Sequence, residues 1–106
     1  MGGSHVNTTI LVVDDSERVR EVTTAMLRRA GFEVTEAATG GEALHLARTR
    51  PDLIVLDINL PDIGGLEVCR RLKANPETTA IPVLYLSGTY ALARKVREVL
   101  EAPGPT

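Results

Sequence analysis

The sequence predicts an open α/β fold in which helices cover both faces of a parallel β-sheet. Three apolar runs, at 10–13, 53–56 and 81–86, alternate with segments whose apolar residues recur at helical spacing. Such runs are typical of parallel strands, because these strands are buried on both faces. Each run ends in polar residues, and in open parallel sheets ligands bind just beyond the carboxyl ends of the strands. The same pattern therefore predicts the fold and the edge that carries its site.

The first half of the chain contains two predicted strand–helix units. A strand at 8–13 precedes a helix that Ser16 caps. Alternating apolar and polar residues at 32–37 predict a half-exposed edge strand. Thr39 caps a short second helix, which ends before Pro51. The residues at helical spacing are Val19, Val22, Met26 and Ala30 in the first helix and Ala43, Leu44 and Ala47 in the second.

The second half repeats this order twice. The strand at 52–57 is the most apolar and is therefore predicted to be central. A loop at 61–65 leads into a third helix, which Asn75-Pro76 breaks. A fourth strand runs to Ser87 and a fourth helix follows. Four successive strand–helix units with right-handed crossovers predict a doubly wound sheet. The residues at helical spacing are Leu66, Val68, Cys69 and Leu72 in the third helix and Leu92, Val96, Val99 and Leu100 in the fourth.

Length and composition fit one globular domain. The chain has 106 residues, of which 43% are hydrophobic and 25% charged, as in ordinary globular proteins. We expect a tail or cloning remnant at 1–7, one domain at 8–102 and a second tail at 103–106.

Charge and cysteine content exclude several classes of function. The net charge is −2 with both signs interspersed, which argues against binding to nucleic acid or to an anionic membrane. No apolar stretch has membrane-spanning length, and the N-terminus lacks the pattern of a signal peptide. The single cysteine, Cys69, leaves no internal disulfide and fits a reducing compartment, so we expect a cytoplasmic protein.

Three carboxylates are predicted to meet at the carboxyl edge of the sheet: Asp14, Asp15 and Asp57. Two of them adjoin a helix N-terminus, where they would repel a bare phosphate, and no glycine-rich phosphate loop follows the first strand. A hard divalent cation reverses this preference, since Mg²⁺ is held by carboxylates together with phosphate oxygens. With such an ion bound, a third carboxylate can attack phosphorus and form an aspartyl phosphate.

Several motifs at matching spacing resemble the receiver domain of two-component response regulators. They are Asp14-Asp15, Asp57-x-Asn59-x-Pro61, the Gly65-Leu66 turn and Ser87 at the end of the fourth strand. The resemblance extends over 8–100 and implies a flavodoxin-like receiver fold.

The resemblance implies a role for each matching residue. Asp57 would accept a phosphoryl group from a histidine kinase or phosphotransfer protein. Asp14, Asp15, Asp57 and the backbone carbonyl of Asn59 would hold Mg²⁺. Ser87 would hydrogen-bond the phosphoryl group and transmit the change to a signalling surface, which a downstream output domain or protein would read. Such a domain assists its own phosphorylation and dephosphorylation and is otherwise not an enzyme.

The family pattern continues beyond the fourth predicted helix with a fifth strand, a lysine at its end and a fifth helix. None of these follows here, and neither Lys73 nor Lys95 matches the family lysine by position. The fourth strand would then leave an unpaired edge, which predicts self-association. A clipped fragment, a degenerate gene and completion by a second molecule all remain open.

Two other functions compete with this interpretation. A receiver-like interaction module without phosphoryl transfer would explain the absent lysine but not the intact acidic set. A phosphatase of the haloacid-dehalogenase type also uses an aspartate nucleophile and Mg²⁺. That class needs a second aspartate two residues after a nucleophile on the first strand, whereas Asp57 follows the third strand and Asn59 takes the second position. Ser87 could also be a simple helix cap.

Overall fold

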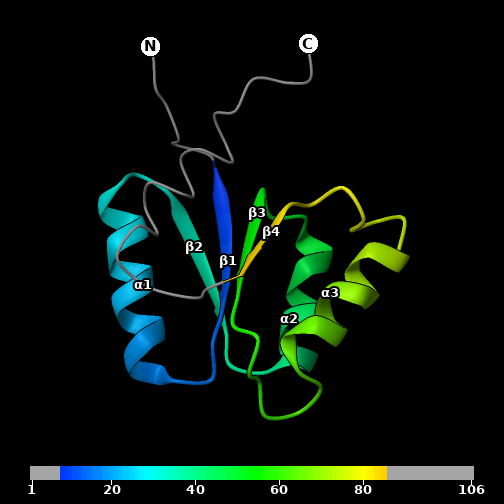
Figure 1. Cartoon of the computed structure of the whole chain (residues 1–106). Coiled ribbons are helices and arrows are strands. Elements are labelled where there is room, and N and C mark those ends of the chain that lie inside the picture. Colours follow the sequence, from blue (N-terminus) through cyan, green and yellow to red (C-terminus); the bar gives the residue numbers. More distant parts are fainter. Residues whose placement is uncertain (1–7, 86–106) are drawn as a thin grey trace.

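The computed structural model describes residues 8–85 and contains four parallel strands with three α-helices (Figure 1). The two predicted tails, Ser87 and the fourth predicted helix lie outside the described residues. In chain order the elements are β1 (Thr9–Val13), α1 (Glu17–Arg29), β2 (Glu33–Ala37), α2 (Gly40–Leu46), a 3₁₀ helix η1 (Ala47–Thr49), β3 (Leu53–Leu56), α3 (Gly65–Ala74) and β4 (Val83–Tyr85).

The strand order is β2-β1-β3-β4, and every neighbouring pair is parallel. The prediction that the third strand is central is confirmed, because β3 lies between β1 and β4. The second strand is at the β2 edge, also as predicted. In the register of the sheet, Val13 lies opposite both Ala37 and Leu56. The residues that follow these strands therefore emerge at one rim.

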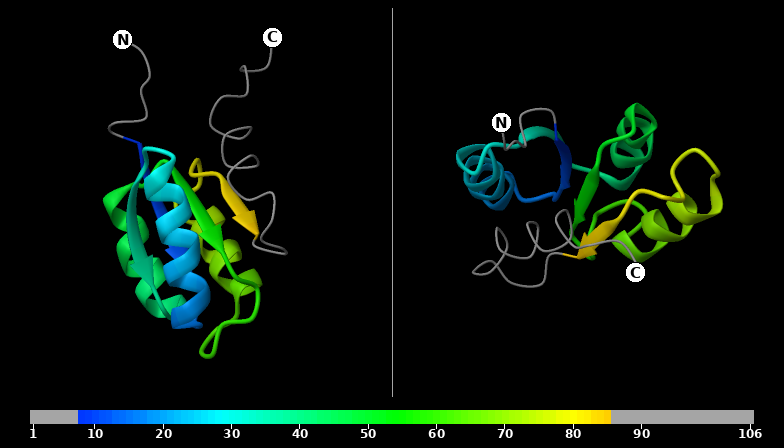
Figure 2. Two further views of the ribbon diagram at one scale, coloured as in Figure 1. Left: turned by 90° about the vertical axis from the view of Figure 1, so that its left-hand side faces the viewer. Right: turned by 90° about the horizontal axis from the view of Figure 1, so that it is seen from above.

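Helices cover both faces of the sheet (Figure 2), and the sheet separates two apolar cores. Alternate residues of β1 and β3 point to opposite faces, and both strands are fully buried from Ile10 and Leu53 onward. Met26 and Leu27 of α1 and its C-cap residue Ala30 pack on one face, whereas α2 and α3 cover the other. The core on the α1 side contains Ile10, Val12, Leu27, Phe32, Val34, Leu53 and Val55; that on the α2–α3 side includes Leu11, Val13, Ala43, Ala47, Ile54, Leu56, Val68 and Leu72.

The predicted caps are present, but two residues of the helical patterns face solvent. Ser16 Oγ accepts a hydrogen bond from the Val19 amide at 3.2 Å, which caps α1. Val22 is nevertheless 55% exposed, and the buried stripe of α1 is Thr23, Thr24 and Leu27. Leu66 in α3 is likewise 63% exposed. Spacing alone located the helices, whereas the direction of their buried faces depends on how they pack.

In the part of the chain that the structure describes, no helix is both long and apolar enough to cross a membrane.

Candidate metal centre

Two backbone hydrogen bonds bring Asp14 and Asp57 to adjacent positions. The Asp57 amide donates to the Val13 carbonyl at 2.9 Å, and the Asp14 amide donates to the Ala37 carbonyl at 3.1 Å. Both bonds continue the ladders of the sheet by one residue beyond the strands. The register that aligns β1, β2 and β3 therefore also places the backbones of Asp14 and Asp57 side by side at the rim of the sheet.

The carboxylates of Asp14, Asp15 and Asp57 converge, as the sequence predicted. One oxygen from each lies within 4.8 Å of the others. Asp14 is buried, at 4% exposure, while Asp57 is half-buried and Asp15 exposed. The cluster thus opens to solvent on one side and rests on the protein core on the other.

Local hydrogen bonds orient two of these carboxylates. Asp14 Oδ1 accepts from the Ser16 amide at 2.9 Å, and Asp57 Oδ1 accepts from the Asn59 amide at 3.2 Å. In each case an aspartate bonds the backbone two residues onward, a turn that this side chain favours.

Burial raises the pKa of Asp14 above its ordinary value. The hydrogen bond from Ser16 opposes this effect, whereas the negative charges of Asp57 and Asp15 add to it. Gathering three carboxylates here thus disfavours the ionised form of the buried one. A hard cation would remove this cost, and carboxylate oxygens are the donors that such cations prefer. The donor set fits a divalent metal.

The loop between β3 and α3 approaches the backbone of Asp57 closely at Gly65. The Gly65 amide donates to the Ile58 carbonyl at 2.7 Å. A Cβ atom at position 65 would lie 2.7 Å from Ile58 Cα and closer still to the Asp57 carbonyl oxygen. Only glycine fits this position, which explains the Gly65-Leu66 turn noted in the sequence. Asn59 lies on this loop and is exposed.

Arg20 also contacts the turn that carries Asp14, a role that reasoning from the sequence missed. Its Nη1 donates to the Asp14 carbonyl at 2.8 Å, and its Nε pairs with Glu36 Oε1 at 3.0 Å. The side chain is only 17% exposed. Arg20 therefore ties α1 and the end of β2 to the turn that carries Asp14. Its position one turn into the helix was visible in the sequence, but its partners depend on the sheet register.

The two remaining sequence-based questions concern Lys73 and Ser87. Lys73 Nζ donates to the carbonyls of Thr79 at 3.2 Å and Ile81 at 2.8 Å, so it ties the end of α3 to the segment before β4. This location confirms that Lys73 does not serve the acidic cluster. Ser87 lies just beyond the described residues, and its role stays a prediction.

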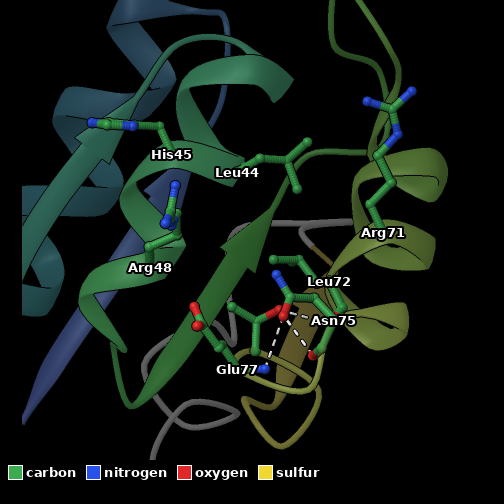
Figure 3. Close-up of a pocket in the computed structure, with 8 residues that line it drawn as sticks. Leu44, His45, Arg48, Arg71, Leu72, Asn75 and Glu77 are labelled. Carbon is green, nitrogen blue, oxygen red and sulfur yellow. Dashed lines mark hydrogen bonds between the residues drawn. The ribbon is translucent and has the colours of Figure 1, made fainter.

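A separate cavity of about 480 Å³ lies between the later turns of α2 and α3 (Figure 3). Three of its polar side chains are already engaged. Asn75 Oδ1 accepts from the Glu77 amide at 2.9 Å, Thr78 Oγ1 donates to the Leu72 carbonyl at 2.7 Å, and Arg71 pairs with Glu67. Figure 3 shows Arg71 extending away from Asn75 and Glu77. The acidic cluster, where three carboxylates converge, is therefore the better candidate site.

Fold and site together define a doubly wound α/β domain with an acidic, cation-compatible rim at the carboxyl ends of its strands. The family model described as the response regulator receiver domain matches residues 10–103. The chain belongs to this family, whose members are phosphoacceptor domains of two-component signalling.

Individual relatives agree with this assignment. Protein PilH of Pseudomonas aeruginosa is 40% identical over 79 residues, covering 74% of this chain and 65% of PilH. The alkaline phosphatase synthesis transcriptional regulatory protein PhoP of Bacillus subtilis is 43% identical over 83 residues, covering 77% of this chain and 34% of PhoP. The chain therefore spans less than two thirds of the length of either relative.

A solved structure shows the same fold. The response regulator protein TrrA of Thermotoga maritima, crystallised in complex with Mg²⁺–BeF, superposes with a TM-score of 0.71 at 28% identity. The match covers 87% of this chain and 98% of TrrA.

Proposed function

We propose that Asp57 is the phosphoacceptor of this receiver domain and that the acidic cluster holds Mg²⁺. Asp14, Asp15, Asp57 and the backbone carbonyl of Asn59 would be the protein ligands. The observation that carries the proposal is the convergence of three carboxylate oxygens within 4.8 Å at the rim of the sheet. The similarity to TrrA, which was crystallised with Mg²⁺–BeF, supports it.

Among the three carboxylates, Asp57 is best suited to attack phosphorus. It is half-buried, and its Oδ1 is oriented by the Asn59 amide, while its second oxygen has no hydrogen bond among those found in residues 8–85. Asp14 is too buried to meet an incoming phosphodonor, and Asp15 is exposed and accepts no side-chain hydrogen bond found among residues 8–85. A carboxylate held in one orientation loses little freedom on reaching the transition state.

In the proposed reaction an Asp57 oxygen forms a bond to phosphorus as the bond from phosphorus to the donor breaks. With a phosphohistidine donor the leaving group is the histidine nitrogen, and with acetyl phosphate it is acetate. A bound Mg²⁺ would offset the repulsion between the carboxylates and the phosphoryl oxygens. Asp14 and Asp15 would hold the cation, so that this repulsion stays offset while Asp57 reacts.

The proposal also covers partners and output. A histidine kinase or phosphotransfer protein would donate the phosphoryl group, and Ser87 would hydrogen-bond it on Asp57. The domain would assist its own phosphorylation and dephosphorylation without acting on a foreign substrate. A downstream output domain or protein would respond to the phosphorylated domain. The name of PhoP, a transcriptional regulatory protein, supports such an output.

Phosphorylation of the purified chain tests the assignment. With acetyl phosphate and Mg²⁺, we expect mass spectrometry to place one phosphoryl group on Asp57. The Asp57→Asn variant should carry none, because an amide oxygen is not a nucleophile of this kind. Asp52→Asn is the matched control: Asp52 is an exposed aspartate at the opposite end of β3 and should leave labelling unchanged. Labelling that persists in Asp57→Asn would refute the role of Asp57. A wild-type chain that stays unlabelled would favour the interaction module.

A further inference from the structure

The carboxylate of Asp62 joins two segments that lie far apart in the sequence. Its Oδ1 accepts a hydrogen bond from the Gly40 amide at 2.8 Å, and its Oδ2 accepts from the Gly41 amide at 2.9 Å. Asp62 belongs to the loop between β3 and α3, whereas Gly40 and Gly41 begin α2. Both oxygens of one side chain therefore hold the loop against a neighbouring helix.

The first turn of α2 needs these acceptors. The first amides of a helix have no partner within the helix. Thr39 Oγ1 accepts from the Glu42 amide at 3.1 Å, and Glu42 Oε1 in turn accepts from the Ala38 amide at 2.8 Å. This reciprocal pair leaves the amides of the first two helical residues, which Asp62 takes up. The first turn of α2 thus offers two amides that bind a carboxylate from another part of the chain. The hydrogen bonds from Gly40 and Gly41 to Asp62 are called the clamp below.

The same loop carries the main chain that borders the acidic cluster. Its start is fixed by Asp57, whose Oδ1 accepts from the Asn59 amide, and its end by Gly65, whose amide donates to Ile58. Leu60 is buried in the core on the α2–α3 side. Between Leu60 and Gly65, Asp62 supplies the side-chain hydrogen bonds found for the described part of the loop.

We propose that Asp62 is a positioning residue: by binding the first turn of α2, it holds the β3–α3 loop so that Asn59 stays beside the acidic cluster. The inference rests on the proposed function, because it assigns Asn59 and the cluster to one metal site. Residues behind the direct ligands of a metal orient those ligands, and their loss weakens metal binding.

The electrostatics of the clamp agree with this role. The amides of Gly40 and Gly41 hold the pKa of Asp62 below its usual range, so the carboxylate is ionised at neutral pH. A negative charge at the start of a helix is also favoured by the helix dipole. Space is restricted as well, since a Cβ atom at position 40 would lie 2.5 Å from Ile63 Cγ1 and 2.8 Å from Val68 Cγ2. The helix and the loop are therefore in direct contact beside the clamp.

Three variants test the inference. Asp62→Ala removes both hydrogen bonds, and Asp62→Asn keeps one acceptor oxygen in case the alanine variant does not fold. Asp52→Ala is the matched control, because Asp52 Oδ2 accepts from the Thr9 amide at 2.8 Å at the opposite end of the sheet. Mg²⁺ affinity is measured by titration calorimetry. Amide hydrogen exchange at Ile58, Asn59 and Gly65 is measured without metal.

We expect Asp62→Ala to weaken Mg²⁺ binding about tenfold, the lower end for residues that support metal ligands. Exchange in the loop should become faster, Asp62→Asn should fall between alanine and wild type, and Asp52→Ala should match wild type in both measurements. Equal Mg²⁺ affinity in Asp62→Ala and wild type would overturn the inference while leaving the proposed function intact. An equal loss in Asp52→Ala would also overturn it, because the effect would then be general destabilisation.

The exchange measurement separates this inference from the proposed function. A wild-type chain that does not bind Mg²⁺ contradicts the proposed metal site. Exchange without metal still tests the clamp in that event, and unchanged exchange in Asp62→Ala would overturn it.

Discussion

Asp14 contributes an oxygen to the acidic cluster but lowers the stability of the metal-free fold. It is a buried carboxylate whose pKa is raised first by burial and then by the charges of Asp57 and Asp15. A carboxyl group with a raised pKa stabilises the fold below its unfolded pKa, and this contribution is lost as the pH rises through the folded pKa. Without metal, Asp14 therefore works against folding at pH values above its folded pKa.

Asp14→Asn should consequently stabilise the metal-free protein. An asparagine keeps an oxygen to accept from the Ser16 amide but removes one of three clustered charges. We expect a gain on the order of 1 kcal/mol in the free energy of unfolding at pH 7, the scale of two unit charges about 4 Å apart in bulk water. The gain should shrink as the pH falls toward about 4, where an unfolded aspartate protonates. Urea unfolding in a chelator at several pH values measures it. A wild type more stable than the variant at pH 7 would contradict this account.

At the scale of elements, the contact between α2 and the β3–α3 loop depends on two adjacent glycines with different surroundings. A Cβ atom at Gly40 would collide with Ile63 and Val68, whereas one at Gly41 would have an ordinary contact of 3.5 Å with Asp62 Oδ2. Neither glycine has a positive φ angle, so the two positions differ in the space available for a side chain and not in backbone strain.

The two alanine variants should therefore change stability in opposite directions. Gly40→Ala should lower the free energy of unfolding by about 1–3 kcal/mol, the usual cost of overpacking. Gly41→Ala should raise it by up to about 1 kcal/mol, because alanine is the better helix former. Thermal and urea unfolding of both variants provide the comparison. Two variants with the same stability would show that α2 and the loop are not packed as described.

Local patterns predicted the elements and the acidic cluster but not the contacts between elements. The strands, the caps at Ser16 and Thr39 and the convergence of the three aspartates followed from apolar runs and strand ends. The pairing of Arg20 with Glu36 and of Asp62 with Gly40 could not be predicted in this way. In both pairs the partner lies on another element, and the tertiary packing of the sheet and helices brings the two together. The exposure of Val22 was missed for a related reason: helical spacing does not say which stripe faces the sheet.

At the scale of the whole molecule, the site is a consequence of topology. The parallel order β2-β1-β3-β4 places the ends of β1 and β3 side by side, so carboxylates from distant parts of the chain share one rim. Two apolar cores hold the sheet from both faces. The acidic cluster is thus supported by buried strands, and the β3–α3 loop beside it is attached at Leu60, Asp62 and Gly65.

Binding of Mn²⁺, followed by NMR, tests the central claim most directly. Mn²⁺ accepts the same oxygen ligands as Mg²⁺ and broadens the signals of nearby nuclei. Substoichiometric Mn²⁺ should broaden the amide signals of Asp14, Asp15, Asp57 and Asn59, and excess Mg²⁺ should restore them. The signal of Asp52, at the other end of β3, should broaden much less, because the effect falls steeply with distance. Broadening centred elsewhere, or none at the four residues, would contradict a shared metal site at this rim.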